Sequence, residues 1–187
     1  MRIELAPGQT AVVGYGSLVS RLSAEQTLGR AYDGPFERCH VAGWRRSWDI
    51  AMPNETFYYR EHGEAVYPKR ILYLNVRREP GALLNVVIFV VGARELEELH
   101  KREWIYDARV VTGDLRGVTV AGGDAIMYVA KPEYIVKDVP DPREAAVRAS
   151  YLRIVQEGLN RADEAFRTEY ARTTDPVPEH LVVEDVR

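Results

Sequence analysis

The sequence has one cysteine, little net charge and no long apolar run, and each of these features excludes a class of protein. With Cys39 alone, the chain cannot form an internal disulfide and has too few thiolates for a structural zinc site. Cys39 is either a thiol buried in a strand or, next to His40, a nucleophile beside a base. The formal net charge is −3 at pH 7, whereas nucleic-acid-binding domains usually have a basic face or a high pI. We therefore expect no nucleic acid among its partners.

Membrane and metal signatures are missing as well. The N-terminal residues have no apolar core of the length that a signal peptide needs, and no stretch is long enough to span a bilayer. We therefore expect a cytoplasmic protein with no membrane partner. The histidines are scattered without the spacing of metal ligands, so neither a metal site nor a cofactor is expected. Their positions are His40, His62, His100 and His180.

The composition is that of an ordinary soluble domain. Hydrophobic residues make up 46% of the chain and charged residues 28%. A chain of 187 residues fits one domain and can bury a sizeable core. No internal repeat or linker divides it. We therefore predict a single domain over residues 1–187, in which residues 175–187 form a C-terminal tail whose order the sequence leaves open.

Strands are predicted wherever apolar residues alternate or run together. Gly43 predicts a bend in the longest early strand, although Trp44 and Trp48, four residues apart, also fit a helix. Pro80-Gly81 predicts a turn between two core strands, and the last three strands predict a meander. A polar and aromatic stretch, residues 53–69, is predicted to be a long loop. The predicted strands are residues 11–13, 38–52, 70–77, 82–91, 108–112, 117–120 and 124–131.

Helices are predicted from capping signals and from good helix formers. In the first, Ser23 and Gln26 form a candidate capping box and Gly29 a candidate C-cap. The segment Asp141-Pro142-Arg143-Glu144 has the residue types of a helix start. The predicted helices are residues 20–29, 93–107, 141 to about 158, and 162–170.

The stretch Thr10–Ser20, TAVVGYGSLVS, is the predicted working centre of the chain. A short buried strand runs into a turn at Gly14 and Gly16. Glycines can adopt positive φ and let main-chain N–H groups face a ligand, so such a loop can hold an anion or a carboxylate. A plain turn at the end of a strand is the alternative, because short glycine motifs are common.

Glu103 is the second feature of interest. In a helix over residues 93–107, it lies about 20° from Leu96 and about 40° from Leu99 around the axis, on the apolar side. Five charged residues fall on the other side of this helix, where solvent is expected: Arg94, Glu97, Glu98, Lys101 and Arg102. Because burying an unpaired carboxylate is costly, Glu103 is either paired with a cation or kept there for chemistry.

The loop and Glu103 together suit one kind of reaction. A cradle of main-chain N–H groups can hold a carboxylate or a developing oxyanion, and a buried Glu can move a proton. The pair fits an acyl transfer that needs neither a metal nor a covalent enzyme intermediate. The loop lacks the third glycine of a dinucleotide fingerprint and a Walker lysine, and Ser17 is not framed as in a G-x-S-x-G nucleophile elbow.

Four segments make the sequence resemble the gamma-glutamylcyclotransferase-like family, including its ChaC-like relatives, over roughly residues 12–159. The resemblance implies an α+β fold, a single domain with a mixed barrel-like β-sheet flanked by helices. It also implies that Tyr15, Gly16, Ser17 and Leu18 form the substrate loop and that Glu103 is the catalytic acid/base. Tyr151 matches a family tyrosine and is either a hydrogen-bonding partner of the substrate or a core residue. The four segments are VVGYGSL, GWRRSW, LEELHKREWIYDARVV and SYLRIVQEGL.

The resemblance implies release of 5-oxoproline and a free amine from a gamma-glutamyl amide, with a small gamma-glutamyl compound as the partner. The alternative is a binding module on the same scaffold without turnover. Two departures, Leu99-His100 and Asn85, leave open which branch of the family applies and hence the leaving amine. The leaving amine is expected to meet the 54–68 loop, whose aromatic residues are Phe57, Tyr58, Tyr59 and Tyr67.

Overall fold

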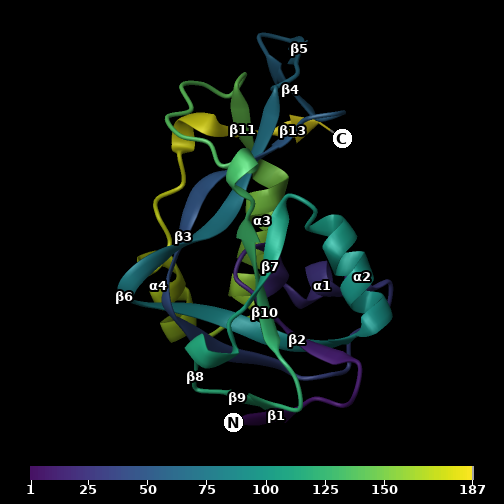
Figure 1. Ribbon diagram of the computed structural model, residues 1–187. Helices are drawn as coiled ribbons and strands as arrows, with labels where there is room; N and C mark the ends of the chain where they lie inside the picture. The colour runs from purple at the N-terminus through teal and green to yellow at the C-terminus, as the bar shows by residue number, and fades with distance from the viewer. Residues whose placement is uncertain (187) are drawn as a thin grey trace.

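Two long antiparallel strands form the frame of the fold (Figure 1). In this computed structural model, which describes residues 1–186, β3 spans Phe36–Pro53 and β6 spans Arg70–Gly92. They pair from Phe36 opposite Phe89 to Pro53 opposite Arg70. The predicted bend in β3 is present, because Gly43 has a φ of 82° and the register shifts there.

The predicted turn at Pro80-Gly81 is wrong. The two predicted strands are the two halves of β6, and both pair with β3. The dipeptide lies in the irregular stretch between Arg78 and Leu83, which pair with Trp44 and Ala42. Pro80 cannot donate to the sheet and Gly81 has a φ of 85°, so the two residues form an exposed bulge rather than a hairpin.

The main sheet is mixed and strongly curled. Its order is β12-β11-β6-β2-β10-β7, with β3 and β8 (Leu115–Arg116) added through β3. Strand β2 (Gln9–Gly14) is antiparallel to β6 and parallel to β10 (Ala125–Ala130). One end is β7 (Tyr106–Val110), antiparallel to β10. At the other end β11 (Ala145–Arg148) pairs in parallel with β6 and with the end strand β12 (Val182–Val183).

The predicted meander forms only in part. Strands β7 and β10 pair directly, but β9 (Thr119–Ala121) leaves the main sheet and pairs in parallel with β1 (Arg2–Glu4). Gly117, with a φ of 83°, lies between β8 and β9, where the chain leaves the sheet.

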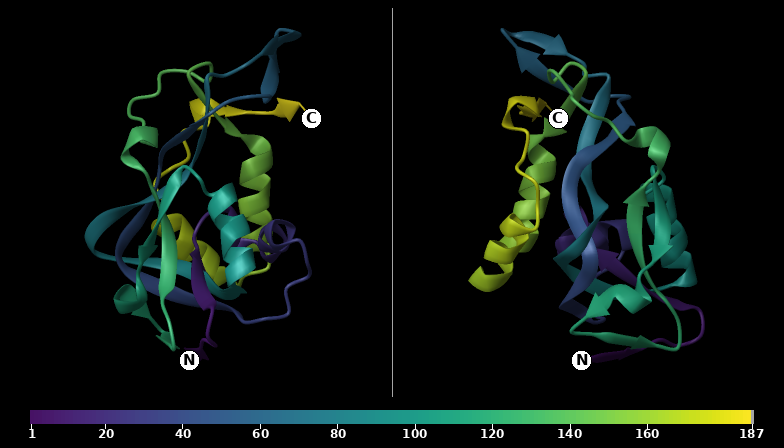
Figure 2. Two further views of the ribbon diagram at one scale, coloured as in Figure 1. Left: turned by 45° about the vertical axis from the view of Figure 1, so that its right-hand side comes forward. Right: turned by 60° about the vertical axis from the view of Figure 1, so that its left-hand side comes forward.

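Residues 1–186 form four α-helices, which lie on the outside of the sheet. They are α1 (Arg21–Leu28), α2 (Ala93–Arg102), α3 (Ala149–Asn160) and α4 (Glu164–Arg172). Figure 2 shows α3 and α4 along one side of the long strands and α2 on the other side. Gly29 ends α1 in the left-handed region, as predicted, but the N-cap is Ser20 rather than Ser23. Short 3-10 turns are η1 (Ser17–Val19), η2 (Thr112–Asp114), η3 (Pro132–Tyr134) and η4 (Glu179–Leu181).

The third helix begins later than predicted. Asp141 Oδ1 accepts hydrogen bonds from the main-chain N–H groups of Arg143 (2.7 Å) and Glu144 (3.3 Å), but this closes one turn only. The following residues form β11 because Ala145, Ala146 and Val147 are fully buried against β6 and β12. The capping pattern was present, and burial of an apolar strand overrode it.

The predicted loop over residues 53–69 contains a β-hairpin. Strands β4 (Tyr58–Glu61) and β5 (Glu64–Val66) are joined by His62 and Gly63, both with positive φ. The C-terminal strand β13 (Asp185–Val186) adds to β4 as the third strand of this small sheet. The last part of the predicted tail therefore pairs with two sheets, through Val182–Val183 and Asp185–Val186.

The core lies inside the curled sheet. Leu84, Ile88 and Met127 are fully buried there, together with Cys39. Burial raises the pKa of the Cys39 thiol to about 12, so it is a buried apolar side chain rather than a nucleophile.

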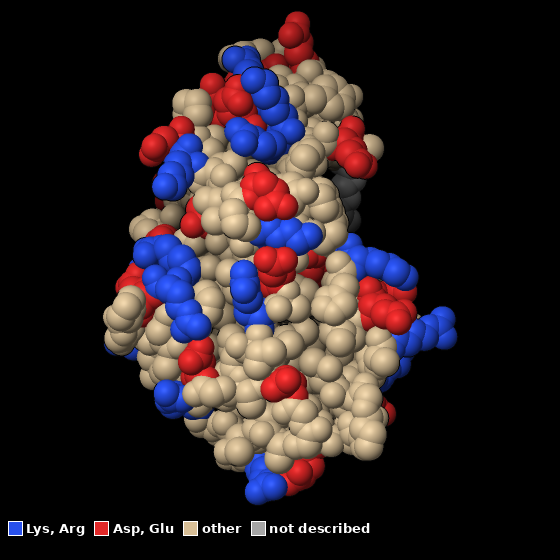
Figure 3. Space-filling model, viewed as in Figure 1, with Lys and Arg blue, Asp and Glu red and all other residues tan. Residues whose placement is uncertain are grey.

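No helix within residues 1–186 is long and apolar enough to cross a membrane. On the face shown in Figure 3, basic and acidic side chains are interspersed.

Candidate active site

The loop after β2 leaves main-chain N–H groups without partners. Gly16 accepts a hydrogen bond from Val19 N (3.0 Å), and Ser17 accepts one from Ser20 N (3.1 Å), which closes the turn η1. The first N–H groups of such a turn have no acceptor behind them. Accordingly, the N–H groups of Gly16, Ser17 and Leu18 have no hydrogen-bond partner among residues 1–186.

The two glycines of this loop are required for space rather than for positive φ. Gly16 has a φ of −104°, and Gly14 is not among the glycines with positive φ. The expectation of a left-handed loop is therefore wrong. A Cβ at Gly14 would lie 2.7 Å from the carbonyl oxygen of Leu18, and a Cβ at Gly16 would lie 2.9 Å from the hydroxyl of Tyr151. At Gly14 the obstacle to a side chain is main chain, which cannot move without opening the turn, whereas at Gly16 it is the end of one side chain on α3.

Glu103 lies directly after α2, which ends earlier than predicted. Its main-chain N–H donates to Leu99 O (2.8 Å) as the C-cap of the helix. The side chain still points inward and is 15% exposed. Burial raises the pKa of the Glu103 carboxyl, and the guanidinium of Arg102, with Nε 3.1 Å from Oε1, opposes this shift.

Arg102 was predicted to face solvent, and this is wrong. Its guanidinium donates to Ser17 Oγ (2.8 Å), to Ser23 O (3.1 Å) and to Thr27 Oγ1. One side chain therefore ties the loop, helix α1 and Glu103 together. Arg102 is therefore the cation that pairs with Glu103, a partner that the sequence left open. The pair lies against the loop, because Arg102 also donates to Ser17. Because α2 ends at Arg102, the Arg102 side chain can turn inward. The predicted helix continued to residue 107 and therefore placed this side chain on the outer face.

All six residues that the sequence nominated line one cavity of about 320 Å³. Tyrosines that the sequence did not nominate complete its wall. Tyr106 donates from its hydroxyl to Leu74 O (2.9 Å), and the hydroxyl of Tyr128 lies 2.9 Å from His100 Nδ1. The nominated residues are Tyr15, Gly16, Ser17, Leu18, Glu103 and Tyr151, and the additional tyrosines are Tyr73, Tyr106 and Tyr128.

The cavity tyrosines are hydrogen-bond donors rather than bases. Burial raises the pKa of Tyr15 and Tyr106 well above the ordinary value, and the negative charge of Glu103 adds to this effect. Burial also raises the pKa of Tyr151, whose ring packs edge-on against Tyr73 at 4.9 Å between centroids. Tyr151 is therefore both a packed residue and a donor at the cavity wall. Glu103 is the one carboxylate among the described residues that line the cavity.

The aromatic residues of the 54–68 segment do not line this cavity, contrary to expectation. The rings of Tyr58, in β4, and Tyr67, just after β5, pack against each other in a tilted arrangement with 5.4 Å between their centroids. The ring of Phe57 packs against the guanidinium of Arg148. Arg148 does line the cavity, and the sequence gave no reason to select it. Residues 1–186 contain no group of three or more His, Cys, Asp or Glu arranged to hold a metal ion.

Solved structures share this fold, although no protein-family model and no curated protein sequence matches the chain. A gamma-glutamyl cyclotransferase superimposes with a TM-score of 0.60 at 11% identity, covering 91% of this chain and 90% of that one. The uncharacterized human protein loc79017 gives 0.59 at 13% identity, with the same coverage. A yeast gamma-glutamyl cyclotransferase specific to glutathione gives 0.53 at 10% identity, covering 89% of this chain and 97% of that one.

These matches define the fold class. The chain has the gamma-glutamyl cyclotransferase-like fold, a mixed α+β single domain with a curled, partly closed sheet and helices around it. The fold that the resemblance implied is confirmed. Identities of 10–13% carry no information about activity or substrate by themselves, so the function is argued from the site.

Proposed function

We propose that this protein is a gamma-glutamyl cyclotransferase, which releases 5-oxoproline and a free amine or amino acid from a gamma-glutamyl amide. The observation that carries the proposal is the buried Glu103 carboxylate in one cavity with the unpartnered N–H groups of Gly16, Ser17 and Leu18. The fold supports it, because solved gamma-glutamyl cyclotransferases share the arrangement of strands and helices.

The reaction needs a proton carrier and an oxyanion site. Glu103 takes a proton from the substrate α-ammonium, and the freed amine attacks the γ-carbonyl carbon to form the ring C–N bond. The carbonyl oxygen becomes an oxyanion, which the loop N–H groups stabilise. When the tetrahedral intermediate collapses, the original amide C–N bond breaks, Glu103 returns its proton to the departing amine, and the ring nitrogen releases its second proton to solvent. A carboxyl whose pKa burial raises is suited to both transfers.

The nucleophile belongs to the substrate, so the protein contributes mainly by holding a conformer that can cyclise. Oriented intramolecular reactions gain large effective molarities, on the order of 10⁵ M or more. The rigid loop, closed by Gly14 and Gly16 against Leu18 and Tyr151, provides such a surface. Tyr15, Ser17, Leu18 and Tyr151 are proposed to bind the gamma-glutamyl group, with Glu103 as the acid/base.

A binding module without turnover is the second candidate. The contact between Arg102 and Glu103 favours it, because a carboxylate held by a cation is a weaker base. The two candidates differ in one product. An enzyme forms 5-oxoproline from at least one gamma-glutamyl compound, whereas a module binds such compounds and leaves them intact.

The test is a panel of gamma-glutamyl amino acids, peptides and amines, with 5-oxoproline measured by chromatography and mass spectrometry. We expect Glu103→Gln to lower kcat by roughly 10²- to 10⁴-fold, the usual contribution of a general acid/base. The matched control is Glu98→Gln on the preceding helix α2, where Glu98 is exposed and paired with Lys101 (2.7 Å).

Glu103→Gln should keep its melting temperature and its substrate binding by calorimetry, because a neutral side chain suits this buried position. Full activity of that variant would contradict the assigned role of Glu103. Binding of gamma-glutamyl compounds without 5-oxoproline from any of them would establish the module instead.

A further inference from the structure

Arg148 is a cation on the cavity wall that takes no part in the proposed mechanism. It is the last residue of β11 and the N-cap of α3, so its backbone is fixed by a strand paired on both sides and by a helix start. The side chain is 34% exposed and lines the same cavity as Glu103 and Tyr151. Its guanidinium carbon lies 5.2 Å from the centre of the Phe57 ring.

Asp185 binds the guanidinium of Arg148 on the side away from the cavity, and some of the guanidinium N–H groups have no hydrogen-bond partner. Nη2 donates to Asp185 Oδ2 at 3.0 Å, and Asp185, whose side chain is 1% exposed, also accepts from Ser150 N (2.9 Å). Nε of Arg148 is buried and has no hydrogen-bond partner among residues 1–186. A guanidinium has five N–H donors in a planar fork that fits carboxylates. Asp185 therefore orients Arg148 without using up its capacity to bind a second carboxylate.

The charges of the cavity favour a ligand that is negative overall. Among residues 1–186, three charged side chains line it, Arg102, Glu103 and Arg148, and the first two form an ion pair. Asp185 is not on the cavity wall. The glutamyl part of a substrate carries one α-ammonium and one α-carboxylate, which cancel. A carboxylate on the amine part would complement Arg148, and a polyamine would bring like charge towards it.

We propose that Arg148 binds a carboxylate on the amine part of the substrate, so that the protein acts on gamma-glutamyl amino acids or peptides rather than on gamma-glutamyl amines or polyamines. This inference rests on the proposed function and names its substrate class. It also gives the C-terminal strand β13 a part in the site, because Asp185 of β13 positions Arg148.

The experiment compares two substrates that differ only in that carboxylate, gamma-glutamyl-alanine and gamma-glutamyl-alaninamide. We expect the wild-type protein to prefer the acid by roughly 10- to 100-fold in kcat/KM, the range of a charge-assisted hydrogen-bonded contact. Arg148→Met should bring this acid-to-amide ratio close to one, and Arg148→Lys should retain part of it. The matched control is Arg153→Met, which removes an exposed cation that also approaches Asp185 (3.9 Å) outside the cavity.

Three results overturn the inference. One is equal kcat/KM for acid and amide in the wild-type protein. Another is an Arg148→Met variant that loses activity on both substrates by the same factor, because that would place the glutamyl α-carboxylate at Arg148. The third is an Arg153→Met variant that changes the ratio as much as Arg148→Met does.

The proposal can still be tested if the Arg148→Met variant does not fold. If melting curves show that Arg148→Met is unfolded, the wild-type ratio and Arg148→Lys decide. If no gamma-glutamyl compound gives 5-oxoproline, the proposed function fails, and calorimetry with the acid and the amide then tests Arg148 by itself. Equal affinity for the two compounds overturns the inference in that case, and tighter binding of the acid supports it.

Discussion

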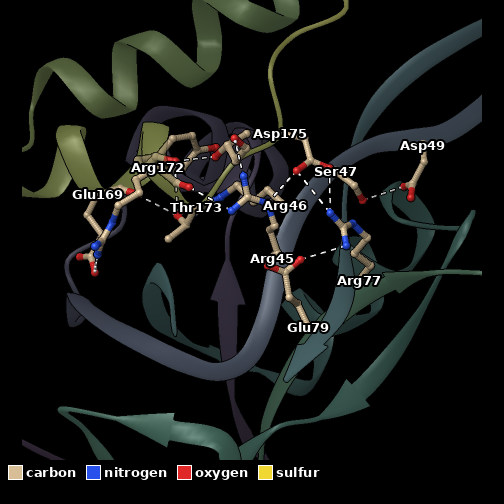
Figure 4. Close-up of polar contacts among 12 residues, drawn as sticks. Arg45, Arg46, Ser47, Asp49, Arg77, Glu79, Glu169, Arg172, Thr173 and Asp175 are labelled. Atoms are coloured by element: carbon tan, nitrogen blue, oxygen red, sulfur yellow. Dashed lines mark hydrogen bonds and ion pairs between the residues drawn. The ribbon is translucent and has the colours of Figure 1, made fainter. Parts of the chain in front are cut away.

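Arg46 donates from Nε to the carbonyl oxygen of Tyr15 at 2.8 Å, from a position with no solvent exposure. The same guanidinium donates to Thr173 Oγ1 at 2.8 Å (Figure 4). It also donates to Asn85 Oδ1 (3.2 Å) and lies over the ring of Tyr170, 3.6 Å from its centre. Burial lowers the pKa of Arg46 to about 10, so it stays charged at neutral pH. Tyr170 also donates to the Tyr15 carbonyl (2.7 Å). The loop after β2 is therefore held through the carbonyl oxygen of Tyr15, which leaves its unpartnered N–H groups unused by this network.

Replacing Arg46 should destabilise the fold. We expect Arg46→Met to lower the free energy of unfolding by about 2–4 kcal/mol, because it leaves the buried oxygens of Tyr15, Asn85 and Thr173 short of a donor. Urea unfolding measures this. The control is Arg77→Met, which removes an exposed cation paired with Glu79 and Asp175 and should cost at most about 1 kcal/mol. Equal losses in the two variants would mean that the buried network contributes little.

Local patterns in the sequence were sufficient for the loop and for Glu103. The β-branched run before Gly14 predicted a buried strand, and β2 forms there. The apolar side of the predicted helix pointed Glu103 inward, and it points inward although the helix ends one residue before it. Both features depend on residues close together in the chain, which is where periodicity and turn chemistry are informative.

The support around the loop could not be predicted in the same way. Arg46 contacts segments about 30, 40 and 127 residues away, and no local period encodes such contacts. Asn85 illustrates the difficulty: it was noted only as a departure from the family pattern, yet its amide oxygen accepts from Arg46 and its nitrogen donates to Phe166 O (2.9 Å). Arg148 was missed for a related reason, because its partner Asp185 comes from a segment that was predicted to be a tail.

The two loop glycines should differ in how they tolerate a methyl group. In Gly14→Ala the new Cβ meets the main chain of Leu18, which cannot move without opening the turn, so a loss of about 1–3 kcal/mol in stability is expected. In Gly16→Ala the obstacle is the hydroxyl of Tyr151 alone at under 3 Å. Tyr151→Phe removes that hydroxyl.

Thermal melting of a double-mutant cycle tests this difference. The penalty of Gly16→Ala should shrink in the Tyr151→Phe background by about 0.5 kcal/mol or more, whereas the penalty of Gly14→Ala should stay the same. Simple additivity of Gly16→Ala and Tyr151→Phe would show that the clash at the hydroxyl is not what requires glycine.

Arg102 should set the pH at which the proposed cyclotransferase activity appears. Glu103 must be ionised to accept the first proton, so kcat/KM rises with pH through the pKa of this carboxyl. Burial raises that pKa and Arg102 lowers it. Arg102→Met removes the opposing cation, so the ascending limb of the pH profile should move to higher pH. Lys101→Met, which removes an exposed neighbour paired with Glu98, should leave the limb in place. An unmoved limb in Arg102→Met would contradict this electrostatic coupling.

Asp185 should stabilise the fold only when it is ionised. Burial acts to raise its pKa, but hydrogen bonds from Ser150 and Arg148 outweigh this and lower the pKa to about 2, below the ordinary 3.8. Because the folded protein binds this proton more weakly, the stabilisation is fully present above pH 3.8 and is lost as the pH falls towards 2. Asp185→Asn should therefore lower the free energy of unfolding by on the order of 1–2 kcal/mol at pH 7 and by much less near pH 2.5.

The control is Glu184→Gln, at an exposed neighbour paired with Arg153, which should lower the free energy of unfolding by at most about 1 kcal/mol at either pH. Denaturant unfolding at the two pH values measures both variants, and an equal loss for Asp185→Asn at each pH would show that its charge does not stabilise the strand β13 against α3.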